Sequence, residues 1–372
     1  MNRPAVVVLA PDSFKGTLPA DEVAAALARG WRSVRPGDEV RLAPLADGGE
    51  GTLDAIEAAG GWHRERTVVH DPLGRPVEAA WLRSLGPADG SRGVVEMAEG
   101  SGLSRVAPAE RDAVRASSGG LGELIVAALD AGVRELLVGI GGSASTDGGR
   151  GMLEALGARV DGGRLDLDDL EPRLAALSVR VASDVVNPLL GEHGAAAVYG
   201  PQKGATTPAI VATLERRLAA WASAVESATG ERVRDLPGAG AAGGVGFALL
   251  ALRGRVRGFA LEPGVELVME ATGFRDRLAG ADLVLTGEGR IDGQTAFGKT
   301  VAGVARLARE LGVRCVAVGG SATPDGRAAL EALGAETLAL GGGHGTLSEA
   351  RAAGTEPLER AAAGIAATMG GR

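Results

Sequence analysis

Short apolar runs alternate with helical patterns near both ends of the chain. Strand-length runs at residues 5–10 and 39–45 are each followed by a polar loop and a helical pattern, at 19–31 and 53–59. The same order returns from residue 281, with strands expected at 282–286, 314–318 and 336–340 and helices at 299–311, 325–333 and 356–369. Apolar runs that alternate with helices of about 10–14 residues predict βαβ units and a buried parallel sheet.

The middle of the chain has a different pattern. Two alternating runs, 67–70 and 77–82, flank the turn sequence DPLGRP and predict a hairpin. Further strands are expected at 93–98, 135–140 and 179–182, and a long amphipathic helix at 208–229. These elements predict a mixed α+β region.

We therefore expect an α/β fold in two domains. A Rossmann-like parallel-sheet domain would be assembled from both chain ends, residues 1–65 and 280–372. A second, mixed α+β domain, residues 66–279, would be inserted in it, with the functional site in the cleft between the two, where ligand sites are common.

Composition excludes several classes of function. The 372 residues carry a net charge of −8 and show no basic run, which argues against a nucleic-acid partner. The single cysteine, Cys315, lies in an apolar run and is expected in the core. Neither a signal peptide nor an apolar stretch of about 18 residues is apparent. We expect a cytoplasmic protein with no membrane partner.

Lysine is rare in this chain and occurs only in glycine-rich loops. Of 39 basic residues only three are lysines, namely Lys15, Lys203 and Lys299, and each is followed by Gly or Thr. A compact ammonium performs tasks that the planar fork of arginine cannot perform. The three lysines are therefore candidates for binding anions.

One stretch, residues 281–308, combines a strand, a charged loop and a helix start. The apolar run is expected to end at Gly287, and the loop after it carries Glu288, Arg290, Asp292 and Gln294. Free N–H groups at a helix N-terminus make such a loop a ready anion site. Residues 293–300 match the P-loop pattern G-x-x-x-x-G-K-T, but six residues separate this match from the expected strand end. A convergent match is therefore favoured, and a P-loop NTPase remains an alternative.

Polar residues also follow the other predicted strands. Asp12, Ser13 and Lys15 come after the first strand and suit a phosphate or a carboxylate, unless they form an ordinary exposed turn. Asp47 follows the second strand in the sequence DGGEGT, where an acidic residue either binds Mg²⁺ or caps the next helix. Open α/β sheets bind ligands at these carboxyl ends.

The middle region offers a further phosphate-binding candidate and a candidate base. The loop GGSASTDGG combines glycines with the hydroxyls of Ser143 and Ser145, a composition that suits phosphate binding. Asp184 follows a strand and is placed to accept a hydroxyl proton or to hold a metal, with an Asx turn before Pro188 as the alternative. The candidate phosphate and substrate ligands of this region are Gly141, Gly142, Ser143, Ser145, Asp147, Asn187, Gln202 and Lys203.

The candidate residues as a set favour phosphoryl transfer. They supply lysines, carboxylates and glycine-rich loops, whereas the four histidines show no metal-ligand spacing and no Cys–His pair supports acyl transfer. Phosphoryl transfer from a nucleotide relies on positioning and on charge neutralisation by Mg²⁺ and lysine. A non-catalytic protein that binds a small molecule is a further alternative.

Seven motifs in order resemble the type I bacterial glycerate kinases, and they extend over nearly the whole chain. They read APDSFKGT, PLADGGEGT, GIGGSASTDGG, ASDVVNPL, YGPQKGA, GAGAAGG and TGEGRIDGQTAFGKT. The resemblance implies a two-domain kinase that uses ATP and Mg²⁺ to phosphorylate D-glycerate, with 2-phosphoglycerate as the usual product. Formation of 3-phosphoglycerate by another hydroxy-acid kinase stays open, as does a monomer or a homodimer.

We assign roles to these residues as hypotheses within that resemblance. Asp184 would position or deprotonate the glycerate hydroxyl, and Lys15 and Arg290 would clamp the carboxylate or the transferring phosphoryl group. Candidate Mg²⁺ ligands are Asp47, Glu288 and Asp292, whereas Asp12, Ser13, Gln294 and Lys299 join the substrate- and phosphate-binding set.

Overall fold

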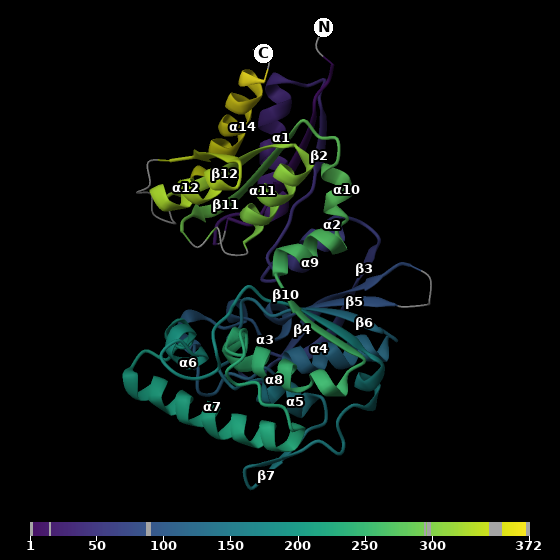
Figure 1. Cartoon of the computed structure of the whole chain (residues 1–372), viewed down its shortest axis with the longest axis vertical. Coiled ribbons are helices and arrows are strands. Elements are labelled where there is room, and N and C mark those ends of the chain that lie inside the picture. Colours follow the sequence, from purple (N-terminus) through teal and green to yellow (C-terminus); the bar gives the residue numbers. More distant parts are fainter. Residues whose placement is uncertain are drawn as a thin grey trace. The chain divides into compact units, whose positions relative to one another are not determined.

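The computed structural model of this chain contains two compact units. It describes residues 3–14, 16–86, 91–293, 295, 299–341 and 352–369. The first unit comprises Met1–Asp47, Asp54–Gly60 and Pro263–Arg372, and the second comprises Gly48–Leu53 and Gly61–Glu262. Each unit has its own sheet, which Figure 1 shows in ribbon form. The predicted Lys15 and Gln294 lie outside the described residues.

A five-stranded parallel sheet forms the centre of the first unit. Its strands, in spatial order, are β13 (Ala335–Ala339), β12 (Arg314–Ala322), β11 (Leu283–Ile291), β1 (Val6–Pro11) and β2 (Glu39–Leu42). Every neighbouring pair is parallel, as the apolar runs predicted. Read from β2 to β13, and numbered by their order along the chain within this unit, the strands are second, first, third, fourth and fifth. This is a common doubly wound arrangement.

Helices cover this sheet because their apolar residues recur at helical spacing. On α1 (Ala20–Val34), the buried Val23, Leu27 and Trp31 are four residues apart and therefore lie on one face. That face packs with α14 (Glu356–Thr368) into one core cluster with β1, β11 and β12. The other helices described in this unit are α2 (Thr52–Ala58, shared with the second unit), α9 (Gly264–Ala271), α10 (Phe274–Leu278), α11 (Thr300–Leu311) and α12 (Pro324–Ala332).

The second unit contains a mixed six-stranded sheet, as expected for the middle region. Its order is β10 (Gly258–Glu262), β9 (Ser178–Ala182), β6 (Glu135–Gly139), β5 (Arg92–Glu96), β4 (Pro76–Ser84) and β3 (Trp62–His70). The strands from β10 to β5 are parallel, whereas β4 pairs antiparallel with both β5 and β3. The hairpin predicted around the sequence DPLGRP is thus β3–β4.

The helices of the second unit enclose its core. They are α3 (Met97–Ser101), α4 (Gly119–Asp130), α5 (Arg150–Ala155), α6 (Ala195–Tyr199), α7 (Pro208–Thr229) and α8 (Val245–Ala251). The longest, α7, begins where the hydroxyl of Thr207 accepts a hydrogen bond from the N–H of Ile210, and ends at Gly230, which has a positive φ. Its buried Leu214, Leu218 and Val225 face the core.

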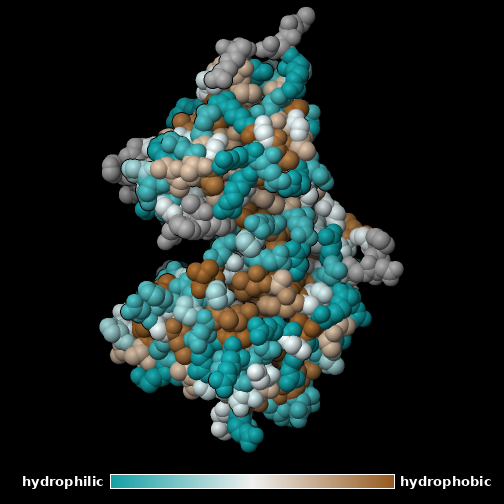
Figure 2. Space-filling model, viewed as in Figure 1, coloured by the Kyte–Doolittle hydropathy of each residue, from teal (hydrophilic) through white to brown (hydrophobic). Residues whose placement is uncertain are grey.

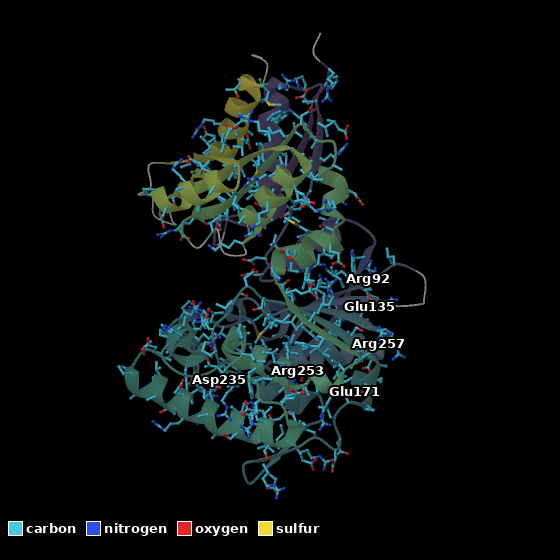
Figure 3. All side chains as sticks on the ribbon, viewed as in Figure 1. Arg92, Glu135, Glu171, Asp235, Arg253 and Arg257 are labelled. Carbon is cyan, nitrogen blue, oxygen red and sulfur yellow. The ribbon has the colours of Figure 1, made fainter. Side chains whose placement is uncertain are left out.

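On the face that Figure 2 shows, hydrophilic residues predominate, with apolar residues among them. Charged side chains lie around the second unit, and Arg257 and Glu135, labelled in Figure 3, are 4.0 Å apart at the nearest nitrogen and oxygen atoms. Within the described part of the chain, no helix is both long and apolar enough to cross a membrane.

One expectation about a strand was wrong, and three strands were not predicted. β11 does not end at Gly287 but continues to Ile291, because residues 288–291 still pair with β12. Glu288 and Arg290 are therefore on the strand and not in a loop. The strand β10 and the small hairpin of β7 (Arg159–Asp161) and β8 (Arg164–Asp166) were not predicted, because these runs are short or interrupted by charged residues.

Candidate functional site

In the first unit, the candidate residues gather where the strand order reverses. β1 and β11 are neighbours, and the N–H of Asp12, just after β1, bonds to the carbonyl of Gly287 at 2.9 Å. Asp12 is buried, and its carboxylate accepts bonds from the hydroxyl of Thr300 at 2.6 Å and from the N–H of Ser13 at 2.6 Å. Crevices beside the carboxyl ends of strands at such a reversal are the usual ligand sites of open α/β sheets.

Lys299 lies beside two of the predicted carboxylates. Its ammonium nitrogen is 3.6 Å from Glu288 and 3.9 Å from Asp292. The hydroxyl of the buried Thr295 donates to Glu288 at 2.7 Å and accepts from the N–H of Asp292 at 3.0 Å. Arg290 is mostly exposed and pairs with Asp292 at 3.3 Å. Opposite charges thus hold Glu288, Asp292 and Lys299 together at the end of β11.

The three proposed metal ligands do not form one cluster. Among the residues that the structure describes, no three His, Cys, Asp or Glu side chains are placed to hold a metal ion together. Glu288 and Asp292 share Lys299 as a neighbour, whereas Asp47 directly precedes the segment 48–53 of the second unit. A Mg²⁺ ion commonly uses only one or two protein carboxylates and takes its other ligands from water and phosphate.

The P-loop-like sequence at residues 293–300 lies closer to the preceding strand than the sequence indicated. Because β11 reaches Ile291, only Asp292 stands between the strand and Gly293, and α11 begins at Thr300. The argument that six residues separate the strand from this string is therefore wrong. Part of the string, residues 294 and 296–298, lies outside the described residues.

In the second unit, three predicted loops converge at the carboxyl ends of β6 and β9. Gly139 and Ala182 are in register, so that the loops after the two strands begin side by side. Gly48 lies against both, because its carbonyl accepts a bond from Gly141 N–H at 3.2 Å and a Cβ on it would be 2.6 Å from that of Ala182. Gly48 also has a φ of +86°, a conformation that glycine adopts without strain.

A buried carboxylate that the sequence analysis missed anchors this arrangement. Glu96, 3% exposed at the end of β5, accepts bonds from the N–H of Gly51 at 3.1 Å and of Leu53 at 3.2 Å. It thereby fixes the segment 48–53 to the sheet. A carboxylate at the end of a strand was the signal used for Asp184, and the same signal could have identified Glu96.

Lys203 is buried beneath the glycine-rich loop. Its side chain leaves the 3-10 turn Pro201–Lys203, is 2% exposed, and donates to the hydroxyl of Ser143 at 2.6 Å and to the carbonyl of Ser145 at 2.7 Å. Burial penalises the charged ammonium and lowers the pKa of Lys203 to about 7, although the carboxylate of Asp147 acts in the opposite direction. Lys203 therefore fixes the backbone of this loop.

In the rest of the loop, one side chain is bonded within the protein and two hydroxyls are left for a ligand. The carboxylate of Asp147 accepts bonds from Ser118 N–H and hydroxyl, both at 2.8 Å, and from Gly149 and Gly151 N–H, both at 3.1 Å. In contrast, the buried hydroxyl oxygens of Ser145 and Thr146 have no hydrogen-bond partner among the described residues. Buried polar atoms are normally paired, so these hydroxyls are suited to a ligand's phosphate oxygens.

The loop after β9 is ordered by its own contacts. Asp184 is half-buried two residues beyond the strand. The amide of Asn187 donates to the carbonyl of His193 at 2.7 Å and accepts from the Tyr199 hydroxyl at 2.8 Å, which shapes the loop around Asp184. Gln202 is exposed, and its backbone carbonyl accepts a bond from Arg111 at 3.4 Å.

Comparisons with known proteins agree with the resemblance seen in the motifs. Residues 7–370 match the model of the glycerate kinase family. A glycerate kinase of Bacillus subtilis is 42% identical, with 98% of this chain and 97% of that protein covered. A glycerate 2-kinase of Escherichia coli is 40% identical with the same coverage. A crystal structure named as a glycerate kinase 2, from Salmonella typhimurium LT2, has a TM-score of 0.81 at 40% identity and covers 99% of both chains. The chain belongs to the glycerate kinase family.

Proposed function

We propose that this chain is a glycerate 2-kinase, which transfers the γ-phosphoryl group of ATP to the 2-hydroxyl of D-glycerate. Family membership over residues 7–370, with a 40% identical relative named glycerate 2-kinase, is the observation that carries the proposal. The hydroxyl oxygen attacks the γ-phosphorus, the bond from that phosphorus to the bridging oxygen breaks, and ADP leaves. The hydroxyl proton passes to a base of the protein.

The glycine-rich loop of the second unit is proposed to bind phosphate. The N–H groups of Gly141 and Gly142 and the hydroxyls of Ser143 and Ser145 are the donors, because backbone and hydroxyl donors suit phosphate oxygens. The unpartnered Ser145 hydroxyl supports this role. The charged form of Lys203 uses two of its three N–H donors on the loop, and an anion above the loop would favour this charged form.

The first unit is proposed to supply Mg²⁺ ligands and part of the charge that stabilises the transferring group. Glu288 and Asp292 offer the oxygen atoms that Mg²⁺ prefers, with Asp47 as a third candidate, bound directly or through water. When bound, Mg²⁺ neutralises charge on the phosphate oxygens. Lys15 and Arg290 are proposed to clamp the carboxylate of glycerate or the phosphoryl group.

Asp184 is the proposed base. It is half-buried at the carboxyl end of β9, and the hydrogen bonds of Asn187 hold the loop that carries it. A carboxylate within hydrogen-bond reach of a substrate hydroxyl can orient it and accept its proton.

We expect a monomer or a homodimer that acts in the cytoplasm.

A P-loop-type nucleotide site in the first unit is a second candidate. The strand β11 ends at Ile291, two residues before Gly293, and α11 starts at Thr300, which is the strand-to-helix context that a P-loop requires. In that case Lys299→Met abolishes ATP binding, whereas Lys203→Met leaves it unchanged.

A coupled assay tests the proposal. Purified protein is incubated with D-glycerate, ATP and Mg²⁺ while ADP release is followed, and enolase is then added without phosphoglycerate mutase. Release of ADP together with direct consumption of the product by enolase is expected. ADP release without enolase consumption indicates the 3-phosphate, and absence of ADP release with D-glycerate overturns the assignment.

A further inference from the structure

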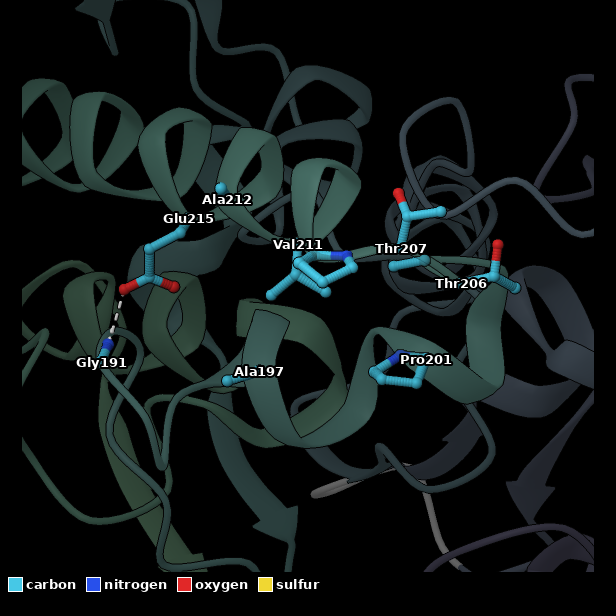
Figure 4. Close-up of a pocket in the computed structure, with 10 residues that line it drawn as sticks. Gly191, Ala197, Pro201, Thr206, Thr207, Val211, Ala212 and Glu215 are labelled. Atoms are coloured by element: carbon cyan, nitrogen blue, oxygen red, sulfur yellow. Dashed lines mark hydrogen bonds between the residues drawn. The ribbon is translucent and has the colours of Figure 1, made fainter.

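A pocket beside the Lys203 turn has different chemistry at its two ends. It has a volume of about 540 Å³, within the range of small-molecule sites, and lies between α7 on one side and α6 with the following turn on the other (Figure 4). Its walls are mainly apolar and include Ala197, Pro201, Ala205 and Val211.

One end of the pocket holds an unused acceptor. Glu215 of α7 accepts a bond from Gly191 N–H at 2.6 Å through one carboxylate oxygen. The other oxygen, Oε2, is buried and has no hydrogen-bond partner within the described part of the chain. Figure 4 shows the dashed bond to Gly191 on one side of the carboxylate and the second oxygen on the side of Val211. An unpaired buried acceptor is costly and is suited to a ligand that donates a hydrogen bond.

The opposite end of the pocket favours an anion. It is lined by Thr206, Thr207 and Pro208, which form the start of the 22-residue helix α7 (Figure 4). The N-terminus of a helix carries partial positive charge, and the hydroxyls of Thr206 and Thr207 can donate hydrogen bonds. The pocket thus accepts a hydrogen-bond donor at the Glu215 end and negative charge at the Thr206 end, with apolar walls between.

The pocket shares a turn with the proposed phosphate loop. Pro201 lines the pocket, and Lys203, two residues later in the same 3-10 turn, extends its side chain to Ser143 and Ser145. Two residues of chain span at most about 7 Å, so the backbone of Lys203 is close to the pocket wall. A ligand that lies in the pocket with its anionic end at Thr206 is therefore near the turn from which Lys203 reaches the glycine-rich loop.

We propose that this pocket binds the nucleoside of the phosphoryl donor, with a 6-aminopurine base between the apolar walls. The exocyclic amine would donate to Glu215 Oε2, and the phosphates would leave past the N-terminus of α7. This inference rests on the proposed kinase function and adds to it the unit that binds the nucleotide and a preference for ATP over inosine triphosphate (ITP), whose 6-oxo group is an acceptor.

Calorimetric titration of ATP and ITP into the protein, without glycerate, tests the proposal. The wild type is expected to bind ATP at least about tenfold more tightly than ITP. The 6-oxo group of ITP and Glu215 Oε2 are both hydrogen-bond acceptors, so they cannot bond to each other. Glu215→Gln keeps an oxygen for Gly191 and offers an NH₂ group in place of Oε2, so it is expected to remove or reverse this preference. The matched control is Glu192→Gln, whose side chain is 87% exposed next to Gly191, and it is expected to keep the wild-type ratio.

A second variant tests whether the pocket is the site at all. Val211→Trp fills the space between the walls and is expected to weaken ATP and ITP alike by at least about tenfold, with an unchanged KM for D-glycerate. If Val211→Trp keeps wild-type ATP affinity while Lys299→Met loses it, the nucleotide binds in the first unit and the pocket proposal is overturned. Equal affinity of the wild type for ATP and ITP also overturns it.

The two proposals fail separately. If the protein releases ADP with D-glycerate but the pocket variants keep wild-type nucleotide affinity, the kinase assignment stands and the nucleoside site is wrong. If the wild type discriminates ATP from ITP through Glu215 but transfers no phosphoryl group to D-glycerate, the nucleoside site stands and the kinase assignment is wrong.

Discussion

The ammonium nitrogen of Lys203 lies 2.6 Å from the hydroxyl oxygen of Ser143, although 60 residues separate them in the sequence. The same nitrogen donates to the carbonyl of Ser145, so one buried side chain fixes two positions of the glycine-rich loop. A loop that binds phosphate by its own backbone must keep its shape before the ligand arrives. If the loop binds phosphate as proposed, Lys203 connects the stability of the second unit to its function.

This burial predicts an unusual dependence of stability on pH. The pKa of Lys203 is lowered to about 7 in the folded chain, whereas an unfolded lysine titrates near about 10.4. Between these values the unfolded state binds one more proton, so the contribution of Lys203 to the unfolding free energy rises with pH, by up to about 1.4 kcal/mol per unit. Below pH 7 the group is charged in both states and this slope disappears.

Chemical unfolding of the wild type and of Lys203→Met at several pH values from 6 to 10 checks this. The variant lacks the titrating group, so the difference in unfolding free energy between the two proteins isolates it. We expect that difference to be flat below about pH 7 and to shift in favour of the wild type above it. A difference that is constant from pH 6 to 10 would show that the pKa of Lys203 is not lowered.

Glu96 is expected to stabilise the segment 48–53. Glu96→Gln replaces one of the two oxygens that accept from Gly51 and Leu53 by an NH₂ group that cannot accept, which leaves one buried N–H unpaired. We expect a loss of about 1–3 kcal/mol in unfolding free energy. Glu135→Gln is the matched control at the exposed start of β6, with an expected loss within about 0.5 kcal/mol. Equal losses in the two variants would contradict the anchoring role.

The hydroxyl of Thr300 is expected to hold Asp12 in position. Thr300→Val keeps the branched shape but removes the donor to the buried carboxylate, and hydrogen bonds to charged groups contribute about 1.5–3 kcal/mol. We expect kcat/KM for D-glycerate to fall at least about tenfold. Thr300→Ser retains the hydroxyl and is expected to stay within about threefold of the wild type. If the valine variant stays within about threefold of the wild type, the hydrogen bond to Asp12 does not matter for catalysis.

Sequence reasoning identified the sheets because their strands are continuous apolar runs. The continuous apolar runs at residues 5–10 and 314–318 are typical of buried parallel strands. It placed the end of β11 too early, because it treated Gly287 as a strand terminator. In the structure Gly287 packs against β12, where a Cβ would meet the carbonyl of Val318 at 2.3 Å, so the glycine permits close strand packing.

The sequence predicted which loops carry the candidate residues but not the contacts between those loops. The GGSASTDGG loop and Lys203 were each identified from composition, yet nothing in their spacing indicated that Lys203 lies beneath that loop. The hydrogen bond between Asp12 and Thr300, which are separated by 288 residues, could not be predicted from the sequence either. Such contacts depend on tertiary packing, which no local pattern encodes.

Asp184 offers the most direct test of the proposed chemistry. Asn has the same size as Asp but cannot take up a proton at neutral pH, so Asp184→Asn removes the proposed base with little change in shape. General-base catalysis typically contributes 10²–10⁴-fold, and we expect kcat to fall by at least about 100-fold.

Asp235→Asn, an identical change at an exposed position of the same unit, labelled in Figure 3, is the matched control for Asp184→Asn and is expected to keep wild-type kcat. The melting temperature of each variant should stay within about 2 °C of the wild type, because a loss of 1 kcal/mol shifts it by about 2–4 °C in a domain of this size. If Asp184→Asn folds normally and retains most of kcat, Asp184 is not the base. Another carboxylate must then accept the proton, or the transfer must depend on positioning and charge neutralisation alone.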